Sequence, residues 1–215
     1  MDFPGKVTVI TGGASGIGAA TARAFAKEGA RVIVADLNEA GAKAVADEID
    51  GIGIRCNVAQ ESDVNSLVRA VEAEFGRIDL FFSNAGVASG GDILDTEIDV
   101  WNTQWQVNLM AHVYAVRAVL PAMLSRGDGY LVHTASMAGI LTTHGNVPYA
   151  VTKHGVVGLA EWLSITYHDK GIRTSLLAPL GVNTPMLTGG DSSFANSSAA
   201  GPVKEAEEVA EMVVK

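Results

Sequence analysis

The sequence is poor in cysteine and proline, lacks long apolar runs and carries no excess of positive charge. Its 215 residues include a single cysteine, Cys56, so no internal disulfide can form and a reducing, cytoplasmic location is expected. Fifteen Lys and Arg against 24 Asp and Glu give a net charge of −9, which argues against a nucleic-acid partner. No apolar run approaches the roughly 18 residues of a membrane span, and the first residues lack a signal-peptide pattern. From these absences we expect an acidic enzyme without a membrane partner.

Short apolar segments alternate with longer helical ones along the chain. The predicted strands cover residues 7–10, 31–36, 54–58, 78–83, 130–135 and 173–178. The predicted helices cover residues 15–29, 39–49, 61–75, 100–126, 149–170 and 205–215. Because the strands are apolar on both faces and helices separate them, the pattern predicts an α/β fold of Rossmann type, a doubly wound parallel sheet between two helix layers. Ligands of such sheets bind beyond the carboxyl ends of the strands.

A glycine-rich turn follows the first predicted strand directly. Gly12, Gly16 and Gly18 permit a tight turn, and Ser15 and Ile17 lie within it. The helix that follows would present its positive N-terminus to an anion such as the pyrophosphate of a dinucleotide. Close packing of strand against helix is the alternative interpretation of such a turn. The flanking strand and helix favour the dinucleotide.

An acidic residue, Asp36, ends the second predicted strand, 18 positions after Gly18. A carboxylate at this place accepts hydrogen bonds from the adenosine ribose hydroxyls and repels a 2′-phosphate. Leu37 follows it, and no Lys or Arg stands in the glycine turn to pair with a 2′-phosphate. The alternative is that Asp36 merely ends an exposed strand. The context predicts NAD rather than NADP as cofactor.

Tyr149 and Lys153 are four positions apart and therefore share one face of a predicted helix. Such pairs are also common on helix surfaces, but beside a nucleotide turn they have a chemical use. A free phenol has a pKa of about 10, too high for a base at neutral pH. An ammonium about 4 Å away, at an effective dielectric near 20, stabilises the phenolate by on the order of 4 kcal/mol, or roughly three pKa units. We therefore expect Tyr149 to exchange a proton with a substrate hydroxyl.

Two further polar residues belong near this pair in the predicted fold. Ser136 follows the fifth strand, where its hydroxyl can hold the substrate oxygen against Tyr149. Asn108 lies inside the predicted helix 100–126, where asparagine is unfavourable and a buried amide needs a partner. A water ordered beside Lys153 would satisfy this amide and open a proton path to solvent.

Taken together, these residues resemble the short-chain dehydrogenase/reductase family. The matching motifs, in family order and spacing, are Thr11-Gly12-(three residues)-Gly16-Ile17-Gly18, Asn84-Ala85-Gly86, Asn108, Ser136 and Tyr149-(three residues)-Lys153. The resemblance covers nearly the whole chain and implies that Asn108, Ser136, Tyr149 and Lys153 form a catalytic tetrad. In that family the lysine also holds the nicotinamide ribose, a role that passes to Lys153.

The resemblance also implies where the cofactor and the subunit contacts lie. The cofactor would contact the residues that follow several strands: Asn57, Val58, Asn84, Ala85, Gly86, Pro179, Val182 and Thr184. The helices that begin near residues 100 and 149 would form the subunit interface of a homodimer or homotetramer.

Two features depart from the family pattern. Leu180 stands where the family usually has a small glycine after Pro179, which alters the loop shape and the pocket volume beside the nicotinamide. The family sheet normally gains one more strand after the helix that begins near residue 205, whereas this sequence ends at Lys215. We therefore expect one domain over residues 1–215 that lacks the usual last strand and is truncated at its C-terminus.

The expected substrate site is apolar. Small polar residues fill most of the segment 185–202, which is predicted to be a mobile lid. Besides Ser136 and Tyr149, the residues expected to line the pocket are Met137, Ile140, Leu141, His144, Val147, Leu180, Met186 and Leu187. This lining favours a hydrophobic secondary alcohol or ketone as substrate. The histidines lack metal-ligand spacing, so no metal is expected.

Two classes of function follow from these observations. The leading hypothesis is an oxidoreductase that transfers a hydride between NAD(H) and a hydrophobic secondary alcohol or ketone, with Tyr149 as the acid/base. The alternative is a dinucleotide-binding regulatory or scaffold protein of the same fold without turnover. The intact tetrad favours the enzyme, whereas Leu180 and the missing strand favour the alternative.

Overall fold

The computed structural model describes residues 2–189 and 202–215 of the chain. Its centre is a six-stranded parallel sheet in the order β3-β2-β1-β4-β5-β6. The strands are β1 Val7–Thr11, β2 Arg31–Asp36, β3 Ile52–Arg55, β4 Leu80–Ser83, β5 Gly129–Thr134 and β6 Ile172–Leu177. The direction of winding reverses between β1 and β4, so the carboxyl ends of these neighbours flank the ligand crevice of a doubly wound sheet. The predicted α/β fold of Rossmann type is thus confirmed.

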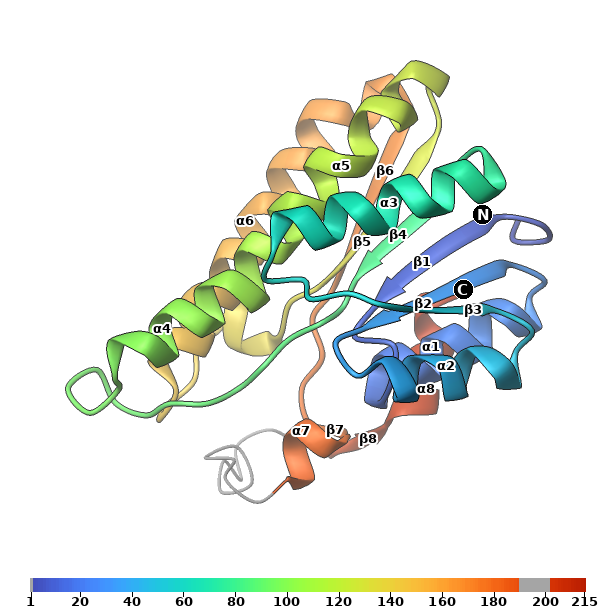
Figure 1. The fold of residues 1–215 in the computed structure, drawn as a ribbon. Coiled ribbons are helices and arrows are strands. Elements are labelled where there is room, and N and C mark those ends of the chain that lie inside the picture. Colours follow the sequence, from blue (N-terminus) through green and yellow to red (C-terminus); the bar gives the residue numbers. More distant parts are fainter. Residues whose placement is uncertain (1, 190–201) are drawn as a thin grey trace.

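Helices cover both faces of this sheet (Figure 1). One layer consists of α1 Gly16–Lys27, α2 Glu39–Glu48 and α8 Ala206–Val213. The other consists of α3 Glu61–Phe75, α5 Ala111–Arg126 and α6 Val147–Tyr167. Further elements are the short helices α4 Ile98–Gln104 and α7 Pro185–Thr188 and a separate parallel pair of two-residue strands, β7 Val182–Asn183 and β8 Lys204–Glu205.

Alternation along the strands divides the core between the two helix layers. Val9 and Phe81 pack toward α3 and α5, whereas their neighbours Ile10 and Phe82 pack toward α1 and α2. Successive side chains of a strand point to opposite faces, and both faces of this sheet are covered. A continuous apolar run is therefore the pattern that such a strand requires.

Residues 98–126 form one continuous helical stretch, but it is less regular than the helix predicted over 100–126. Between α4 and α5, Trp105–Met110 forms a π-helical segment, which contains the fully buried Asn108. Such wider turns occur mostly as local insertions in α-helices, often at functional sites. By length and composition the whole stretch is apolar enough to cross a membrane. Here α5 packs against β4, β5 and α3, as the core helix of a globular fold does.

Other differences from the sequence-based expectation are local. The strand predicted over 54–58 is β3, which begins at Ile52 and ends at Arg55. The prediction missed its start because Gly51 and Gly53 have low β propensity. The β7–β8 pair was not predicted, since two-residue strands carry no periodicity. Pro185–Thr188 of the predicted lid is helical, and residues 190–201 lie outside the described residues. Within the described ranges, no strand pairs with the outer edge of β6.

The close contact between α1 and the glycine turn predicts opposite effects for two glycine substitutions. A Cβ at Gly18 would collide with the carbonyl oxygen of Gly12 and lie 2.7 Å from Asn84 Nδ2. A Cβ at Gly158, exposed in the middle of α6, would meet nothing within 4 Å. Gly18→Ala should therefore lower the free energy of unfolding by about 1–3 kcal/mol. Gly158→Ala, the matched control, should raise it by about 0.5–1 kcal/mol.

Denaturant titration of both variants measures these changes. Equal effects of the two substitutions would show that the turn does not pack against α1 as described.

Candidate active site

A large cavity opens at the carboxyl ends of the strands. Its volume is about 1460 Å³, above the roughly 300–1,000 Å³ of a typical small-molecule site, so a dinucleotide and a small second molecule both fit. The predicted site residues that line it are Gly12, Ser15, Gly16, Ile17, Asp36, Leu37, Asn57, Val58, Asn84, Ala85, Gly86, Ser136, Met137, Leu141, His144, Tyr149, Lys153, Pro179, Leu180, Val182, Thr184, Met186 and Leu187. Gly18 and Asn108 lie behind this surface, and of the expected apolar lining Ile140 and Val147 do not reach it.

The glycine turn has the shape that an anion site needs. Gly12 and Gly16 both have positive φ, +67° and +51°, a conformation that other residues adopt at a cost. Ser15 is the N-cap of α1, and its side chain makes no capping hydrogen bond. The first turn of α1 carries no acidic side chain, so the positive end of the helix faces the cavity without a neutralising carboxylate. These residues fit the pyrophosphate of a dinucleotide.

Asp36 ends β2 at the far side of the turn, and backbone donors orient its carboxylate. One oxygen accepts a hydrogen bond from Ala14 N at 3.0 Å and the other accepts one from Asn38 N at 2.9 Å. Each oxygen keeps lone-pair capacity for a ribose hydroxyl. A cation that the sequence did not reveal lies beside this carboxylate: Arg55 is the partner of Asp36 across the β2–β3 ladder. Arg55 Nη1 lies 3.9 Å from Asp63 Oδ2.

Asn84 connects the glycine turn to the centre of the sheet. Its Nδ2 donates to the carbonyl oxygens of Thr11 and Gly12 at 3.1 and 3.4 Å. Its Oδ1 accepts a hydrogen bond from Thr134 Oγ1 at 3.1 Å. One amide thereby joins the ends of β1, β4 and β5, and it fixes Thr134, whose backbone carbonyl binds Lys153.

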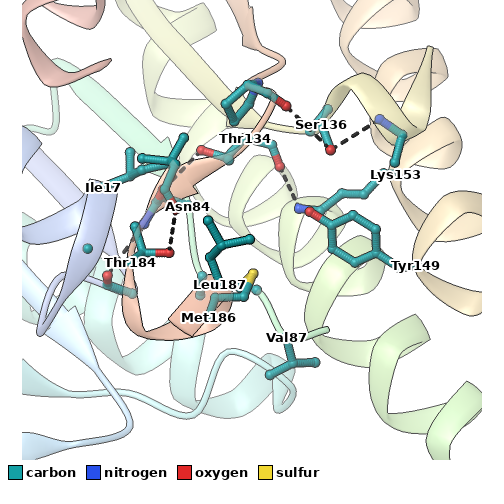
Figure 2. Close-up of a pocket in the computed structure, with 18 of the residues that line it drawn as sticks. Ile17, Asn84, Val87, Thr134, Ser136, Tyr149, Lys153, Thr184, Met186 and Leu187 are labelled. Atoms are coloured by element: carbon teal, nitrogen blue, oxygen red, sulfur yellow. Dashed lines mark hydrogen bonds between the residues drawn. The ribbon is translucent and has the colours of Figure 1, made fainter. Parts of the chain in front are cut away.

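Lys153 extends from α6 into the protein beneath the cavity. Its Nζ donates to the Thr134 carbonyl oxygen at 2.8 Å, and the residue is 2% exposed. Burial disfavours the charged ammonium and lowers the pKa of Lys153 from 10.5 to about 8. The Nζ atom lies 5.6 Å from the centre of the Tyr149 ring (Figure 2), so the predicted pair does converge.

Tyr149 is 7% exposed, and its pKa moves in the opposite direction from the sequence-based expectation. Burial raises the pKa of the phenol above 10, and a hydrogen bond with Ser136 lowers it by a smaller amount. The expected lowering by Lys153 neglected the desolvation of the phenolate. At neutral pH the phenol of Tyr149 is therefore protonated, which is the form that donates a proton.

Ser136 sits directly after β5, on the wall that faces Tyr149 (Figure 2). It is the N-cap of the 3₁₀ turn Met137–Gly139, and its Oγ accepts a hydrogen bond from Ala138 N at 3.1 Å. The hydroxyl also lies 3.5 Å from the carbonyl oxygen of Pro179, to which it donates. Contacts on both sides thus limit how the hydroxyl can turn.

The side chain of Asn108 is hydrogen-bonded by protein groups at both ends of its amide. Its Oδ1 accepts from Val87 N at 2.8 Å, and its Nδ2 donates to Val87 O at 2.9 Å. The Nδ2 also reaches Gln104 Oε1 at 3.1 Å and Thr152 Oγ1 at 3.4 Å. The amide therefore holds the loop after β4 against the helix.

Several residues of the site escaped the sequence reasoning. Thr134 and Val87 act through backbone atoms, which leave no signal in residue type. Gln104 lies one helical turn before Asn108, a spacing that could have marked it as a partner.

His112 and His133 bury their rings against each other, with Nδ1 atoms 3.0 Å apart, and burial lowers the pKa of each.

Comparisons with known proteins agree with this geometry. The family described as short chain dehydrogenase matches residues 6–193. A cyclohexanol dehydrogenase from Acinetobacter sp. is 36% identical over 98% of this chain and 87% of its own length. A 2,5-dichloro-2,5-cyclohexadiene-1,4-diol dehydrogenase from Sphingobium indicum is 36% identical over 85% of this chain and 75% of its own. The crystal structure of a 3-ketoacyl-(acyl-carrier-protein) reductase from Brucella melitensis complexed with NADH superposes with a TM-score of 0.91, at 29% identity, over 98% of this chain and 90% of that one.

The fold and the site define a dinucleotide-binding oxidoreductase that acts on CH–OH groups. The chain belongs to the short-chain dehydrogenase family.

The buried ammonium of Lys153 predicts a distinctive dependence of stability on pH. The pKa of Lys153 is about 8 in the folded protein and has its ordinary value of 10.5 in the unfolded chain. Between these values the unfolded state binds more protons, so this residue makes folding more favourable as pH rises. Relative to Lys153→Met, the wild type should gain up to about 3 kcal/mol of unfolding free energy from pH 8 to pH 10.5.

Chemical denaturation of the two proteins across this range measures the difference. Lys170→Met, the same change at an exposed lysine, is the control. Parallel curves for wild type and Lys153→Met would contradict a buried ammonium.

Proposed function

We propose that the protein is an NAD-dependent dehydrogenase that oxidises hydrophobic secondary alcohols and reduces the corresponding ketones. The observation that carries the proposal is the convergence of Ser136, Tyr149 and Lys153 on the wall of the cavity that also holds the glycine turn and Asp36. A dinucleotide cleft and an acid/base group in one cavity are what hydride transfer to or from a carbinol carbon requires.

The cofactor would bind along the strand ends. The glycine turn and the N-terminus of α1 bind the pyrophosphate, Asp36 binds the adenosine ribose, and Lys153 binds the nicotinamide ribose. When bound, the nicotinamide supplies the carbon that accepts or donates the hydride. The carboxylate of Asp36 supports NAD over NADP because it repels a 2′-phosphate, and the structural relative from Brucella melitensis was solved with NADH. Arg55 beside Asp36 is the feature that favours NADP.

The proton chemistry rests on the buried pair. In ketone reduction the protonated phenol of Tyr149 donates to the substrate oxygen, while Ser136 holds that oxygen by a hydrogen bond. In alcohol oxidation the ammonium of Lys153 favours the phenolate that accepts the proton. Asn108 fixes the loop around Val87 on one side of the substrate space.

The lining of the cavity supports an apolar, uncharged substrate. Near Tyr149 the wall is formed by Val87, Met186 and Leu187 (Figure 2), and Met137, Leu141, His144 and Leu180 add to it. Among the described lining residues the charged side chains are Asp36 and Lys153, and both have roles toward the cofactor. The names of two relatives, which specify a cyclohexanol and a cyclohexadiene diol, support a cyclic alcohol as the first compound to test.

The proposal further includes that each chain forms one domain, that the chains assemble into a homodimer or homotetramer, and that the protein acts in the cytoplasm. Large apolar side chains are exposed on the π-helical segment and on α6, namely Trp105, Val151, Trp162 and Ile165. Their exposure supports the predicted subunit contact through these helices. The cytoplasmic location is supported by the single cysteine, Cys56, which is free.

Tyr149→Phe tests the chemistry. Loss of the phenolic hydroxyl removes the proton donor and should lower kcat for cyclohexanone reduction by about 10²–10⁴-fold. The affinity for NADH, measured by fluorescence titration, should change less than about threefold. Tight NADH binding by a wild type that turns over no alcohol or ketone would instead support a regulatory protein.

Asp36→Asn tests the choice of cofactor. Removing the carboxylate charge should raise kcat/KM for NADPH relative to NADH by at least about tenfold, because a repulsion of at least about 1.4 kcal/mol is lost. Asp47→Asn, the same change at an exposed position of α2, is the matched control and should leave the ratio unchanged. An unchanged ratio of the two kcat/KM values in Asp36→Asn, or a wild type that prefers NADPH, would contradict the assignment of NAD.

A further inference from the structure

A fully buried glutamine, Gln104, lies at the end of α4 directly behind the proposed active site. It has no exposed surface, and an amide in such a place is costly unless both of its ends are hydrogen-bonded. Its Nε2 donates to the backbone carbonyl of Ser89, and its Oε1 accepts from Asn108 Nδ2 at 3.1 Å. Gln104 therefore connects the loop after β4 to the buried Asn108.

These contacts determine which way both amides face. A carbonyl can only accept hydrogen bonds, so Ser89 requires Gln104 to present its NH₂ group to it. The oxygen of Gln104 then faces Asn108 and accepts a hydrogen bond from the NH₂ group of that residue. The backbone of Val87 requires the same orientation of Asn108, because its N–H donates to Oδ1 at 2.8 Å and its carbonyl accepts from Nδ2. Without Gln104, the NH₂ group of Asn108 would keep the Val87 carbonyl and the longer contact to Thr152.

The orientation of the Asn108 amide matters because its Oδ1 and the Lys153 ammonium both lie close to the same position beside Gly86. A Cβ built on Gly86 would lie 3.4 Å from Asn108 Oδ1 and 3.6 Å from Lys153 Nζ. The acceptor oxygen of Asn108 therefore lies on the side of the ammonium, where a negative partial charge is favourable and an NH₂ group is not. Gly86 also lines the cavity.

We propose that Gln104 is a positioning residue for the reaction. It binds the loop after β4 directly at the Ser89 carbonyl and accepts a hydrogen bond from Asn108, and it thereby holds Val87 and the loop 84–91 in the geometry that Tyr149 and Lys153 require. The inference rests on the proposed dehydrogenase activity. It adds to the tetrad a residue that does not line the cavity and touches neither substrate nor cofactor.

The first arm of the test compares two glutamines on the same helical stretch. Gln104→Met keeps the length of the side chain and removes both hydrogen bonds, so kcat for cyclohexanone reduction should fall at least about tenfold, since small displacements of catalytic groups reduce rates strongly. KM for NADH and for ketone should stay within about threefold of wild type. Gln106→Met, the matched control, loses the contact with Tyr114 Oη and should keep the wild-type kcat.

The second arm uses Gln104→Glu and a pH profile. A protonated carboxyl group can donate to Ser89 and accept from Asn108, as the glutamine does, whereas an ionised one can only accept. Burial raises the pKa of a carboxyl group, so the ratio of variant to wild-type kcat should be near one at the acid end of the profile. The ratio should fall to the level of Gln104→Met as pH rises. A ratio that stays flat across the profile would contradict the positioning role.

The outcomes separate this inference from the proposed function. A wild type without dehydrogenase activity overturns the proposed function itself. An active wild type with kcat within twofold of normal in Gln104→Met overturns the positioning role alone. If Gln104→Met does not fold, as judged by its thermal melt, a flat pH ratio in Gln104→Glu overturns the role.

Discussion

A buried ammonium at the carboxyl end of β5 is the constraint on which the rest of the site depends. Lys153 is almost fully buried and its Nζ binds the backbone carbonyl of Thr134. A charge in such a place is tolerated only where dipoles face it. The site supplies them: Thr134 is held by Asn84, and Asn84 is held by the carbonyls of the glycine turn. The glycine turn and Lys153 are thus parts of one hydrogen-bonded unit across β1, β4 and β5.

The same burial determines the proton chemistry of Tyr149 and Lys153. It raises the pKa of the phenol and lowers the pKa of the ammonium, so each is driven toward its neutral form. At neutral pH the phenol keeps its proton and, with a pKa of about 8, most of Lys153 keeps its charge. In the proposed function this is the state that would reduce a ketone. Alcohol oxidation would need the phenolate of Tyr149, and there the charge of Lys153 would offset part of the cost of burial.

Most of the fold and much of the site could be predicted from the sequence, because they depend on residue type and spacing. Apolar β-branched runs followed by helices predicted a parallel sheet between two helix layers, and strand ends such as Asp36 and Ser136 marked the cavity. Contacts made by backbone atoms were not predictable, since the carbonyl of Thr134 and the amide of Val87 could belong to any residue. The π-helical segment also left no signal, because a single inserted residue changes the helical period too little to see. The pKa of Tyr149 was misjudged for a related reason: spacing revealed the charge nearby, whereas desolvation depends on packing that only the folded chain has.

The central claim is that the cavity transfers a hydride between a carbinol carbon and a nicotinamide. The most direct measurement follows the label from cyclohexanol deuterated at its carbinol carbon, incubated with the protein and NAD⁺ and examined by mass spectrometry of the nicotinamide product. The proposed function predicts reduced nicotinamide that carries one deuterium, formed in the same amount as cyclohexanone. Bound NAD⁺ that remains unlabelled, here and with a panel of other deuterated secondary alcohols, would contradict it.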